Sequence, residues 1–157
     1  IVTGAGNGMG KCTAELFAKE GASVAVVDLD FEAAKATARE ITEAGGKAYD
    51  LKADVTDETQ VDKALAEILE RSGSIDILFN NAGICMHQST LEATVEEFRE
   101  VVDINLTGEF IMCRAVGRIM NVASKEASSI WLLCPERSLT SHSGRFLTTL
   151  PKQVLST

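Results

Sequence analysis

The sequence predicts an α/β protein, in which helices cover both faces of a parallel β-sheet. Short apolar runs alternate with amphipathic helical segments along residues 1–124, and the connections between them are short. Residues 23–28 form a continuous apolar run, which is typical of a strand buried on both faces of a parallel sheet. A glycine-rich loop lies between the first apolar residues and the first helical segment.

The first loop, residues 3–10, reads Thr-Gly-Ala-Gly-Asn-Gly-Met-Gly. Glycine at Gly4, Gly8 and Gly10 allows the backbone to turn sharply and to approach a ligand closely. The helix expected over residues 9–20 would direct its free N–H groups and the positive end of its dipole toward an anion. The loop therefore predicts a phosphate-binding site.

The second strand ends in an acidic residue, Asp28, which lies 18 residues after Gly10. A carboxylate at this position accepts hydrogen bonds from the adenosine ribose of NAD and repels the 2′-phosphate of NADP. The loop carries neutral Asn7 rather than a basic residue. The pattern predicts a Rossmann-type, doubly wound parallel sheet that binds NAD. In the alternative interpretation, Asp28 caps the helix that begins near Phe31.

Glycines and capping residues mark the ends of the next elements. A helix over residues 31–44 is stopped by two consecutive glycines. Asp57 and Gln60 predict a capping box at the start of another helix, which Gly73 ends. Strands are expected over residues 23–28, 47–53 and 75–79.

Thr94 and Glu97 predict a second capping box, at the start of a long helix that runs well beyond Asn105. The sequence after this helix has two interpretations. Residues 114–120 are the end of the long helix, or residues 117–124 are the fifth strand of the sheet.

The composition changes after Ser124. Residues 125–157 contain both prolines and the only tryptophan, and they show no clear periodicity beyond Leu133. We therefore expect a nucleotide-binding domain over residues 1–124 and an atypical C-terminal tail over 125–157. The sheet is expected to be truncated at its first strand, where residues before Ile1 are missing, and again after the fifth.

Length and charge restrict the possible partners. The chain has 157 residues, of which 45% are hydrophobic, and a formal net charge of −8. These values predict a single core and argue against nucleic acid or an anionic membrane surface as a partner. The sequence shows neither an apolar run of transmembrane length nor a signal peptide, so a cytoplasmic protein is expected.

The four cysteines are widely spaced and form no Cys-x-x-Cys pair, so no metal site is expected. Buried, reduced thiols are the ordinary interpretation. On the first helix, Cys12 is expected to share a core-facing side with Leu16 and Phe17.

Several motifs together resemble one enzyme family. They are Thr3-Gly4-x-x-x-Gly8-x-Gly10, Asp28, Asp54-Val55, Asn80-Asn81-Ala82-Gly83, Asn105 and Asn121-Val122-Ala123-Ser124. In this order they resemble the short-chain dehydrogenases/reductases over essentially all of residues 1–124. The resemblance implies an NAD(H)-dependent oxidoreductase that transfers hydride between the nicotinamide and a small secondary alcohol or ketone.

The resemblance also implies roles for individual residues. Asp54 would meet the adenine amino group, although an Asp held by local backbone hydrogen bonds is the alternative. Asn105 would hold a water in a proton relay, and Ser124 would hydrogen-bond the substrate. Without the resemblance, Asn105 is a helix kink or a satisfied polar residue. The expected cofactor-binding residues are Thr3, Gly4, Asn7, Gly8, Met9, Gly10, Asp28, Leu29, Asp54, Val55, Asn81, Ala82 and Gly83.

The sequence departs from the family pattern after Ser124. The family uses a Tyr and a Lys four residues later for proton transfer, but Arg137 and Ser141 stand at those positions. The only tyrosine, Tyr49, lies in the third predicted strand. The catalytic half is therefore expected to be missing, which leaves a non-catalytic dinucleotide-binding module or a truncated or spliced interaction form as alternatives. A family-like oligomer stays possible, although the interface helix that bears the Tyr and Lys is not recognisable.

Overall fold

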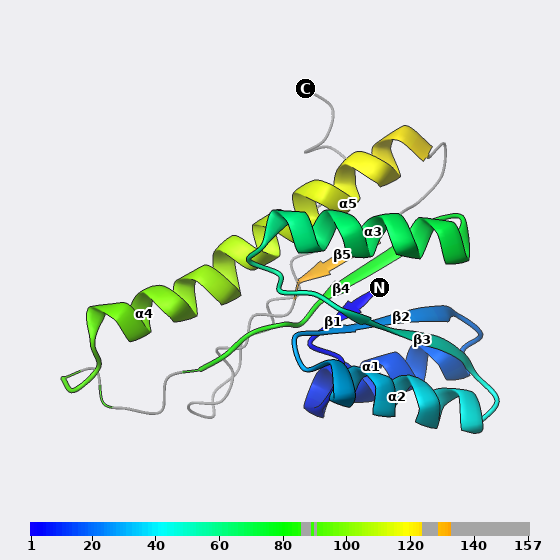
Figure 1. Ribbon diagram of the computed structural model, residues 1–157, viewed down its shortest axis with the longest axis horizontal. Helices are drawn as coiled ribbons and strands as arrows, with labels where there is room; N and C mark the ends of the chain where they lie inside the picture. The colour runs from blue at the N-terminus through cyan, green and yellow to red at the C-terminus, as the bar shows by residue number, and fades with distance from the viewer. Residues whose placement is uncertain (86–88, 90, 124–128, 133–157) are drawn as a thin grey trace, which may run out of the picture.

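The computed structural model describes residues 1–85, 89, 91–123 and 129–132. Within these residues the strands form one five-stranded parallel sheet in the order β3-β2-β1-β4-β5 (Figure 1). The prediction of a doubly wound, Rossmann-type α/β fold is confirmed. The strands are β1 (Val2–Thr3), β2 (Ser23–Asp28), β3 (Lys47–Lys52), β4 (Ile77–Asn80) and β5 (Ser129–Leu132).

Helices cover both faces of the sheet (Figure 1). One face carries α1 (Gly8–Lys19) and α2 (Phe31–Glu43), and the other carries α3 (Glu58–Ser72) and α5 (Glu109–Ala123). Before α5, the chain forms α4 (Val95–Val102) and a π-helical segment, η1 (Asp103–Gly108). None of the helices in the described residues is long and apolar enough to cross a membrane.

The predicted capping residues begin two of the helices. At α4, the Thr94 hydroxyl accepts the Glu97 N–H (3.1 Å) and the Glu97 carboxylate accepts the Thr94 N–H (2.7 Å), which confirms the capping box. Asp57 caps α3 as expected, but the reciprocal bond of a capping box is not formed. The Asp57 N–H donates to the Asp54 carbonyl, and Gln60 instead accepts the Asp54 N–H (3.2 Å).

The structure chooses between the two interpretations of the segment before Ser124. Helix α5 continues to Ala123, so the assignment of residues 117–123 to a strand is wrong. Val116 and Met120 are both buried at helical spacing, which carries the helical pattern past Gly117. The strand that pairs with β4 is β5, in the segment that composition assigned to the tail, and its register runs from Ile77↔Ser129 to Asn80↔Leu132.

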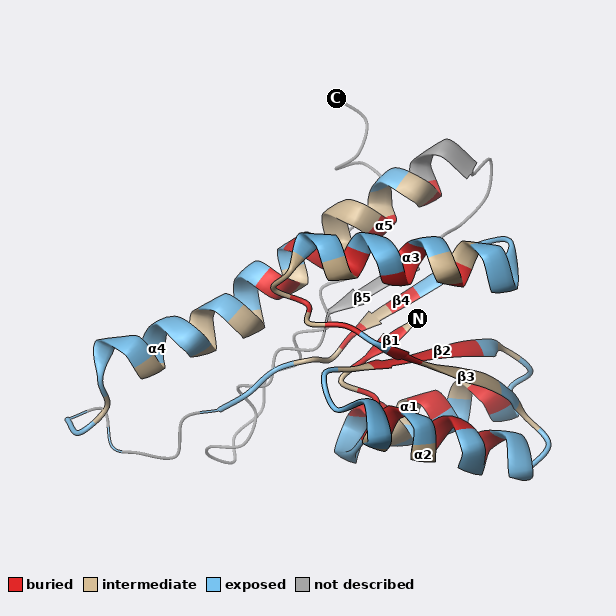
Figure 2. Ribbon diagram, in the orientation of Figure 1, coloured by how far each residue is buried: buried red, intermediate tan, exposed pale blue. Residues whose placement is uncertain are grey.

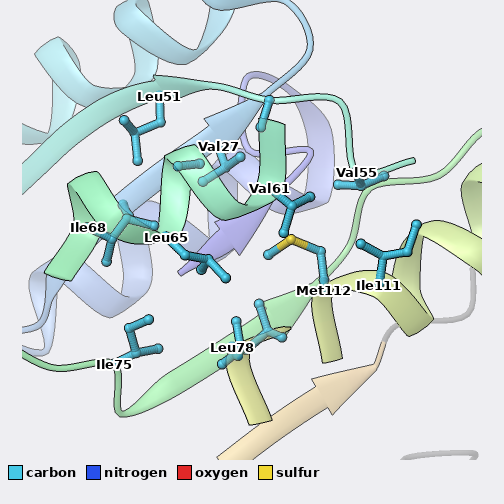
Figure 3. Packing of buried hydrophobic residues seen from close by; sticks show 14 of the residues in the cluster. Val27, Leu51, Val55, Val61, Leu65, Ile68, Ile75, Leu78, Ile111 and Met112 are labelled. Atoms are coloured by element: carbon cyan, nitrogen blue, oxygen red, sulfur yellow. The ribbon is translucent and has the colours of Figure 1, made fainter. Parts of the chain in front are cut away.

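Strand β2 is buried on both faces because alternate side chains enter two different cores. Val24 and Val26 pack toward α1 and α2, whereas Ala25 and Val27 belong to the larger core beneath α3 and α5. Figure 2 shows most of β2 in the colour of buried residues. The members of the larger core shown in Figure 3 include Val27, Leu51, Val55, Val61, Leu65, Ile68, Ile75, Leu78, Ile111 and Met112.

Of the three residues expected on one face of α1, Phe17 packs against the core as predicted, whereas Cys12 and Leu16 do not. Cys12 is exposed, and so is more than half of the Leu16 side chain (54%). The buried residues of this helix are Gly10, Ala14 and Ala18, whose small size allows α1 to lie close to the sheet. The expectation that the cysteines are buried is likewise wrong for Cys12 and for Cys85, which is also exposed.

Leu78 provides a test of the larger core, since its side chain is fully buried on β4. We expect Leu78→Ala to lower the free energy of unfolding by about 2–5 kcal/mol, because it removes buried methyl groups and leaves a cavity. Urea denaturation followed by circular dichroism measures this loss. Leu91, which is 97% exposed, gives the matched control. Equal losses for Leu78→Ala and Leu91→Ala would contradict the described packing.

Candidate functional site

A cavity of about 650 Å³ lies at the carboxyl ends of the strands. Its walls come from the loops after β1, β2, β3 and β4, where the strand order reverses between β1 and β4. Open α/β sheets bind ligands at such a switch point. The cavity brings together all the predicted cofactor-binding residues except Thr3 and Gly10. The lining residues are Gly4, Asn7, Gly8, Met9, Val27, Asp28, Leu29, Asp30, Ala53, Asp54, Val55, Asn81, Ala82, Gly83, Ile84 and Ile104.

Thr3 lies beneath the cavity and joins the end of β1 to the end of β4. Its fully buried hydroxyl accepts the backbone N–H groups of Asn81 (2.9 Å) and Ala82 (3.0 Å). The Asn81 side-chain amide donates in return to the carbonyls of Thr3 and Gly4, each at 3.1 Å. These bonds hold the glycine-rich loop against the Asn-Asn-Ala-Gly loop.

All three motif glycines have a clear physical reason. Gly4 and Gly8 adopt φ values of 60° and 55°, in the left-handed region that disfavours residues with a side chain. Gly10 is required by contact, because a Cβ there would lie 2.1 Å from the Gly4 carbonyl oxygen and 2.5 Å from the Asn81 amide nitrogen. The first turn of α1 can therefore pack directly on the two loops only with glycine at position 10.

The N-terminus of α1 is open toward the cavity. Asn7 is the N-cap residue, and its side chain makes no capping hydrogen bond. The first turn of α1 contains no acidic residue, whereas the first turns of α2, α3 and α4 each contain at least one. Gly8 and Met9, which begin the helix, line the cavity. The unsatisfied N–H groups of a helix start favour an anion at this place.

Asp28 is held by backbone N–H groups on both of its carboxylate oxygens. Its Oδ2 accepts the Gly6 N–H at 2.8 Å, and its Oδ1 accepts the Asp30 N–H at 3.0 Å. The alternative role, as the cap of α2, is wrong. The N-cap is Asp30, whose carboxylate accepts the N–H groups of Glu32 and Ala33. Each Asp28 oxygen keeps a further lone pair for a ligand in the cavity.

Asp54 makes the local hydrogen bonds of the alternative interpretation and also has a place in the cavity wall. One carboxylate oxygen is used locally, where it accepts the backbone N–H (2.9 Å) and the hydroxyl (2.7 Å) of Thr56. The residue also lines the cavity beside Val55. Val55 in turn packs against Gly108, where a Cβ would lie 2.7 Å from a Val55 methyl group. The loop after β3 is thus placed by direct contact with the long helix.

Asn105 lies within η1, and both ends of its side-chain amide bond to the backbone of Ile84. Its Oδ1 accepts the Ile84 N–H (2.8 Å), and its Nδ2 donates to the Ile84 carbonyl (2.7 Å). The structure therefore shows both features of the simpler interpretation, a local departure from α-helix and a satisfied polar side chain. The bonds fix Ile84, which lines the cavity, while Asn105 itself does not.

Sequence reasoning missed five of the lining residues. Val27, Ala53 and Ile84 adjoin predicted residues at strand ends, so their positions carried a signal. Asp30 lies two residues after the predicted Asp28, so its position also carried a signal. Ile104 comes from a helix, and no predicted cofactor-binding residue adjoins it. Ser124, Arg137 and Ser141 lie outside the described residues. The hydroxyl of Tyr49 shares a 2.7 Å hydrogen bond with Ser72, and Tyr49 does not line the cavity.

A buried polar side chain, Asn80, joins the end of β4 to the start of α5. Asn80 is 1% exposed and donates through Nδ2 to the Glu109 carbonyl (3.2 Å) and toward the Cys113 sulfur (3.3 Å). Burial raises the pKa of the Glu109 carboxyl to about 7 and raises the pKa of the Cys113 thiol. One Glu109 carboxylate oxygen is buried without a hydrogen-bond partner in the described part of the chain.

Among the residues that the structure describes, no cluster of three or more His, Cys, Asp or Glu is suited to a metal ion.

Comparison with known proteins gives consistent matches. Residues 1–133 match the family model described as short chain dehydrogenase. Sorbitol dehydrogenase from Cereibacter sphaeroides is 42% identical over 120 residues, which cover 76% of this chain and 46% of that protein. Cyclohexanol dehydrogenase from Acinetobacter sp. (strain SE19) is 38% identical over 134 residues, which cover 79% and 53% respectively.

Solved structures give the same picture. A short-chain type dehydrogenase/reductase from Mycobacterium marinum is 38% identical and superposes with a TM-score of 0.76, covering 80% of this chain and 51% of that one. The chain spans about half the length of the curated relatives it matches.

Glu109 gives a pH-dependent prediction. Its carboxyl pKa is about 7 in the folded chain against an ordinary value of 4.5, so between these pH values the folded state binds more protons than the unfolded state. The free energy of unfolding therefore falls as the pH rises from 4.5 through 7. We expect Glu109→Gln to remove this loss, which is on the order of 1 kcal/mol at pH 8 after allowance for solvent screening.

Urea denaturation at pH 5 and pH 8 measures the effect, with Glu100→Gln on the exposed surface of α4 as the control. The same pH dependence in Glu109→Gln and in the unmodified protein would show that the Glu109 carboxyl is not the group responsible.

Proposed function

Because this chain belongs to the short-chain dehydrogenase family, we propose that its cavity binds NAD(H) and serves an oxidoreductase. The reaction is hydride transfer between the nicotinamide and a secondary alcohol or ketone. The observation that carries the proposal is the convergence of Asp28, the open N-terminus of α1 and the Asn-Asn-Ala-Gly loop on one cavity. The cofactor would supply the hydride chemistry, and the residues below would bind and orient it.

The start of α1 suits the pyrophosphate of a dinucleotide. The free N–H groups of its first turn and the absence of a first-turn acid favour negative charge. Gly4, Gly8 and Met9 line the cavity at this point, and the glycines present no Cβ to a ligand. Thr3 and Gly10 support the loop from below, as structural members of the same site.

Asp28 supports NAD over NADP. Its carboxylate stands at the end of β2 and is aligned by two backbone N–H groups, so its remaining lone pairs can accept ribose hydroxyls. Asp30, a second acid, lines the same cavity next to Leu29. A 2′-phosphate would meet negative charge here without a basic partner among the lining residues. Asp54 and Val55 lie on the adjacent wall, where we place the adenine.

Asn105 and Ser124 are the proposed catalytic residues. Asn105 bonds to the Ile84 backbone through both ends of its amide and keeps one N–H and one lone pair of that amide, which supports a role in holding a water. Ser124 is assigned from the family motif alone. The relatives named for sorbitol and cyclohexanol support a small alcohol as the substrate.

A second candidate function is dinucleotide binding without turnover. The only tyrosine in the chain lies on β3 with its hydroxyl bonded to Ser72, and so it is not placed as a proton donor for the cavity. An Arg side chain such as Arg137 stays protonated, so it cannot replace a phenol that must gain and lose a proton. This observation favours a chain that binds the cofactor but lacks the proton-transfer group.

The remaining proposals concern assembly and location. Val95, Phe98 and Phe110 leave more than half of their side-chain surface exposed along α4 and α5. The family resemblance supports a second copy of the protein as the partner for this surface. A cytoplasmic location is proposed from the sequence alone.

The first test is a fluorescence titration of the 157-residue chain with NADH and, in parallel, with NADPH. We expect saturable binding that favours NADH. We expect Asp28→Ala to weaken NADH binding by about tenfold, because the charged hydrogen bonds to the ribose are lost, and to improve NADPH binding relative to NADH. Glu100→Ala is the charge-matched control on α4. An unchanged preference in Asp28→Ala would exclude Asp28 as the selectivity residue.

A turnover assay separates the two candidate functions. NAD reduction is followed at 340 nm with sorbitol or cyclohexanol as substrate, using chain that has been shown to bind NADH. Saturable binding without turnover is expected for the dinucleotide-binding module. Turnover that is lost in Asn105→Ala, with NADH affinity retained, would instead support the complete oxidoreductase.

A further inference from the structure

We infer that Thr37, a buried residue of α2, is a positioning residue for cofactor selectivity, acting on Asp28 through the peptide of Gly6. The inference rests on the proposed binding of NAD(H). Thr37 is fully buried and donates its hydroxyl hydrogen to the Gly6 carbonyl at 3.1 Å, across 31 residues of sequence. It does not line the cavity, so any effect on the ligand must pass through other residues.

Another threonine of the same helix shows how unusual this bond is. A threonine within a helix ordinarily donates to a carbonyl three or four residues earlier. Thr42 follows this pattern and donates to the carbonyls of Arg39 (2.8 Å) and Ala38 (3.1 Å). Thr37 instead bonds to the glycine-rich loop, and so it ties the interior of α2 to that loop.

Gly6 transmits the position of α2 to Asp28. Its N–H donates to Asp28 Oδ2 at 2.8 Å, while its carbonyl accepts the Thr37 hydroxyl. A Cβ on Gly6 would lie 2.7 Å from the Ala33 Cβ and 2.9 Å from Asp28 Oδ2, so the backbone is enclosed between α2 and the carboxylate. The N–H and the carbonyl of Gly6 are separated only by its φ and ψ bonds. Rotation about these bonds is less restricted in glycine than in any other residue.

The bond to Thr37 therefore supplies a restraint that glycine itself lacks. Without this bond, the buried Gly6 carbonyl would have no hydrogen-bond donor. Rotation of the loop that brought the carbonyl to another donor would then lower the free energy. That rotation would carry the Gly6 N–H away from Asp28 Oδ2 and release one side of the carboxylate. The Asp30 N–H on Oδ1 would then be the remaining backbone restraint.

The two cofactors would respond differently to this loss. NADH presents ribose hydroxyls to Asp28, so its affinity depends on the direction of the carboxylate lone pairs. NADPH presents a 2′-phosphate there and gains no such hydrogen bond. A Thr37 that only stabilised the fold would alter both affinities alike. A Thr37 that orients Asp28 would change their ratio.

The experiment measures the dissociation constants of NADH and NADPH by fluorescence titration for a set of variants. We expect Thr37→Val, which keeps the side-chain shape and removes the donor, to weaken NADH binding about tenfold and NADPH binding less than about twofold. Thr37→Ser keeps the donor and is expected to retain the ratio of the unmodified protein. Thr42→Val removes a hydroxyl from the same helix without contact to the loop, and its ratio should be unchanged. Thr37→Cys carries a weaker donor, so its loss of NADH affinity should lie between those of Thr37→Ser and Thr37→Val. This variant replaces Thr37→Val in the experiment if Thr37→Val does not fold.

A double-mutant cycle tests the route of the effect. If Thr37 acts through Asp28, then adding Thr37→Val to Asp28→Ala has no further effect on the NADH dissociation constant. The same tenfold loss in the Asp28→Ala background, or an equal loss for both cofactors, would overturn the inference. Failure of the unmodified protein to bind NADH would overturn the proposed function itself. Normal binding that is insensitive to Thr37 would overturn only the role assigned to this residue.

Discussion

The candidate site depends on the hydrogen bonds that the buried hydroxyl of Thr3 accepts from the chain after β4. Strand β1 comprises only two residues, so its ladder alone gives little restraint at the junction of the two loops. The hydroxyl satisfies two N–H groups of the Asn81 segment, and the Asn81 amide satisfies two carbonyls of the first loop. The Thr3 hydroxyl is fully buried, so it would be costly to leave unpaired. The facing walls of the cavity are thereby held in one arrangement.

Local signals in the sequence were sufficient for most elements of the fold. Thr94 and Asp57 start helices because their side chains bond to N–H groups three residues away or nearer. The apolar run at β2 identifies a strand buried on both faces, since alternate residues must enter different cores. Of the candidate site, the glycine-rich loop and Asp28 were also visible, because they stand where a strand gives way to a loop. In each case the deciding interaction lies within a few residues.

The features that sequence reasoning missed depend on contacts between distant segments. Nothing near Ile104 indicates that it lines the cavity, and its place follows from packing of the long helix on the loop of Val55. The fifth strand was ambiguous because residues 117–124 could be read either as a strand or as a continuation of the long helix. The choice was set by burial of Met120 within α5 and by pairing of Ser129–Leu132 with β4. Similarly, Asp28 was a candidate cap of α2 in the sequence, whereas in the structure Asp30 accepts the N–H groups of Glu32 and Ala33.

Segment η1 sets the rotational phase of the helix that follows it. Each residue of an α-helix advances the side-chain direction by about 100°, and a π turn accommodates about one residue more than an α turn. The side chains of α5 are therefore rotated by that amount relative to an uninterrupted continuation of α4. This rotation accompanies a change from exposed Phe98 to buried Met112 and Val116. Deletion of one residue within η1 would therefore let this segment become regular α-helix while the buried face of α5 kept its direction, because the π turn holds the extra residue without turning the helix that follows.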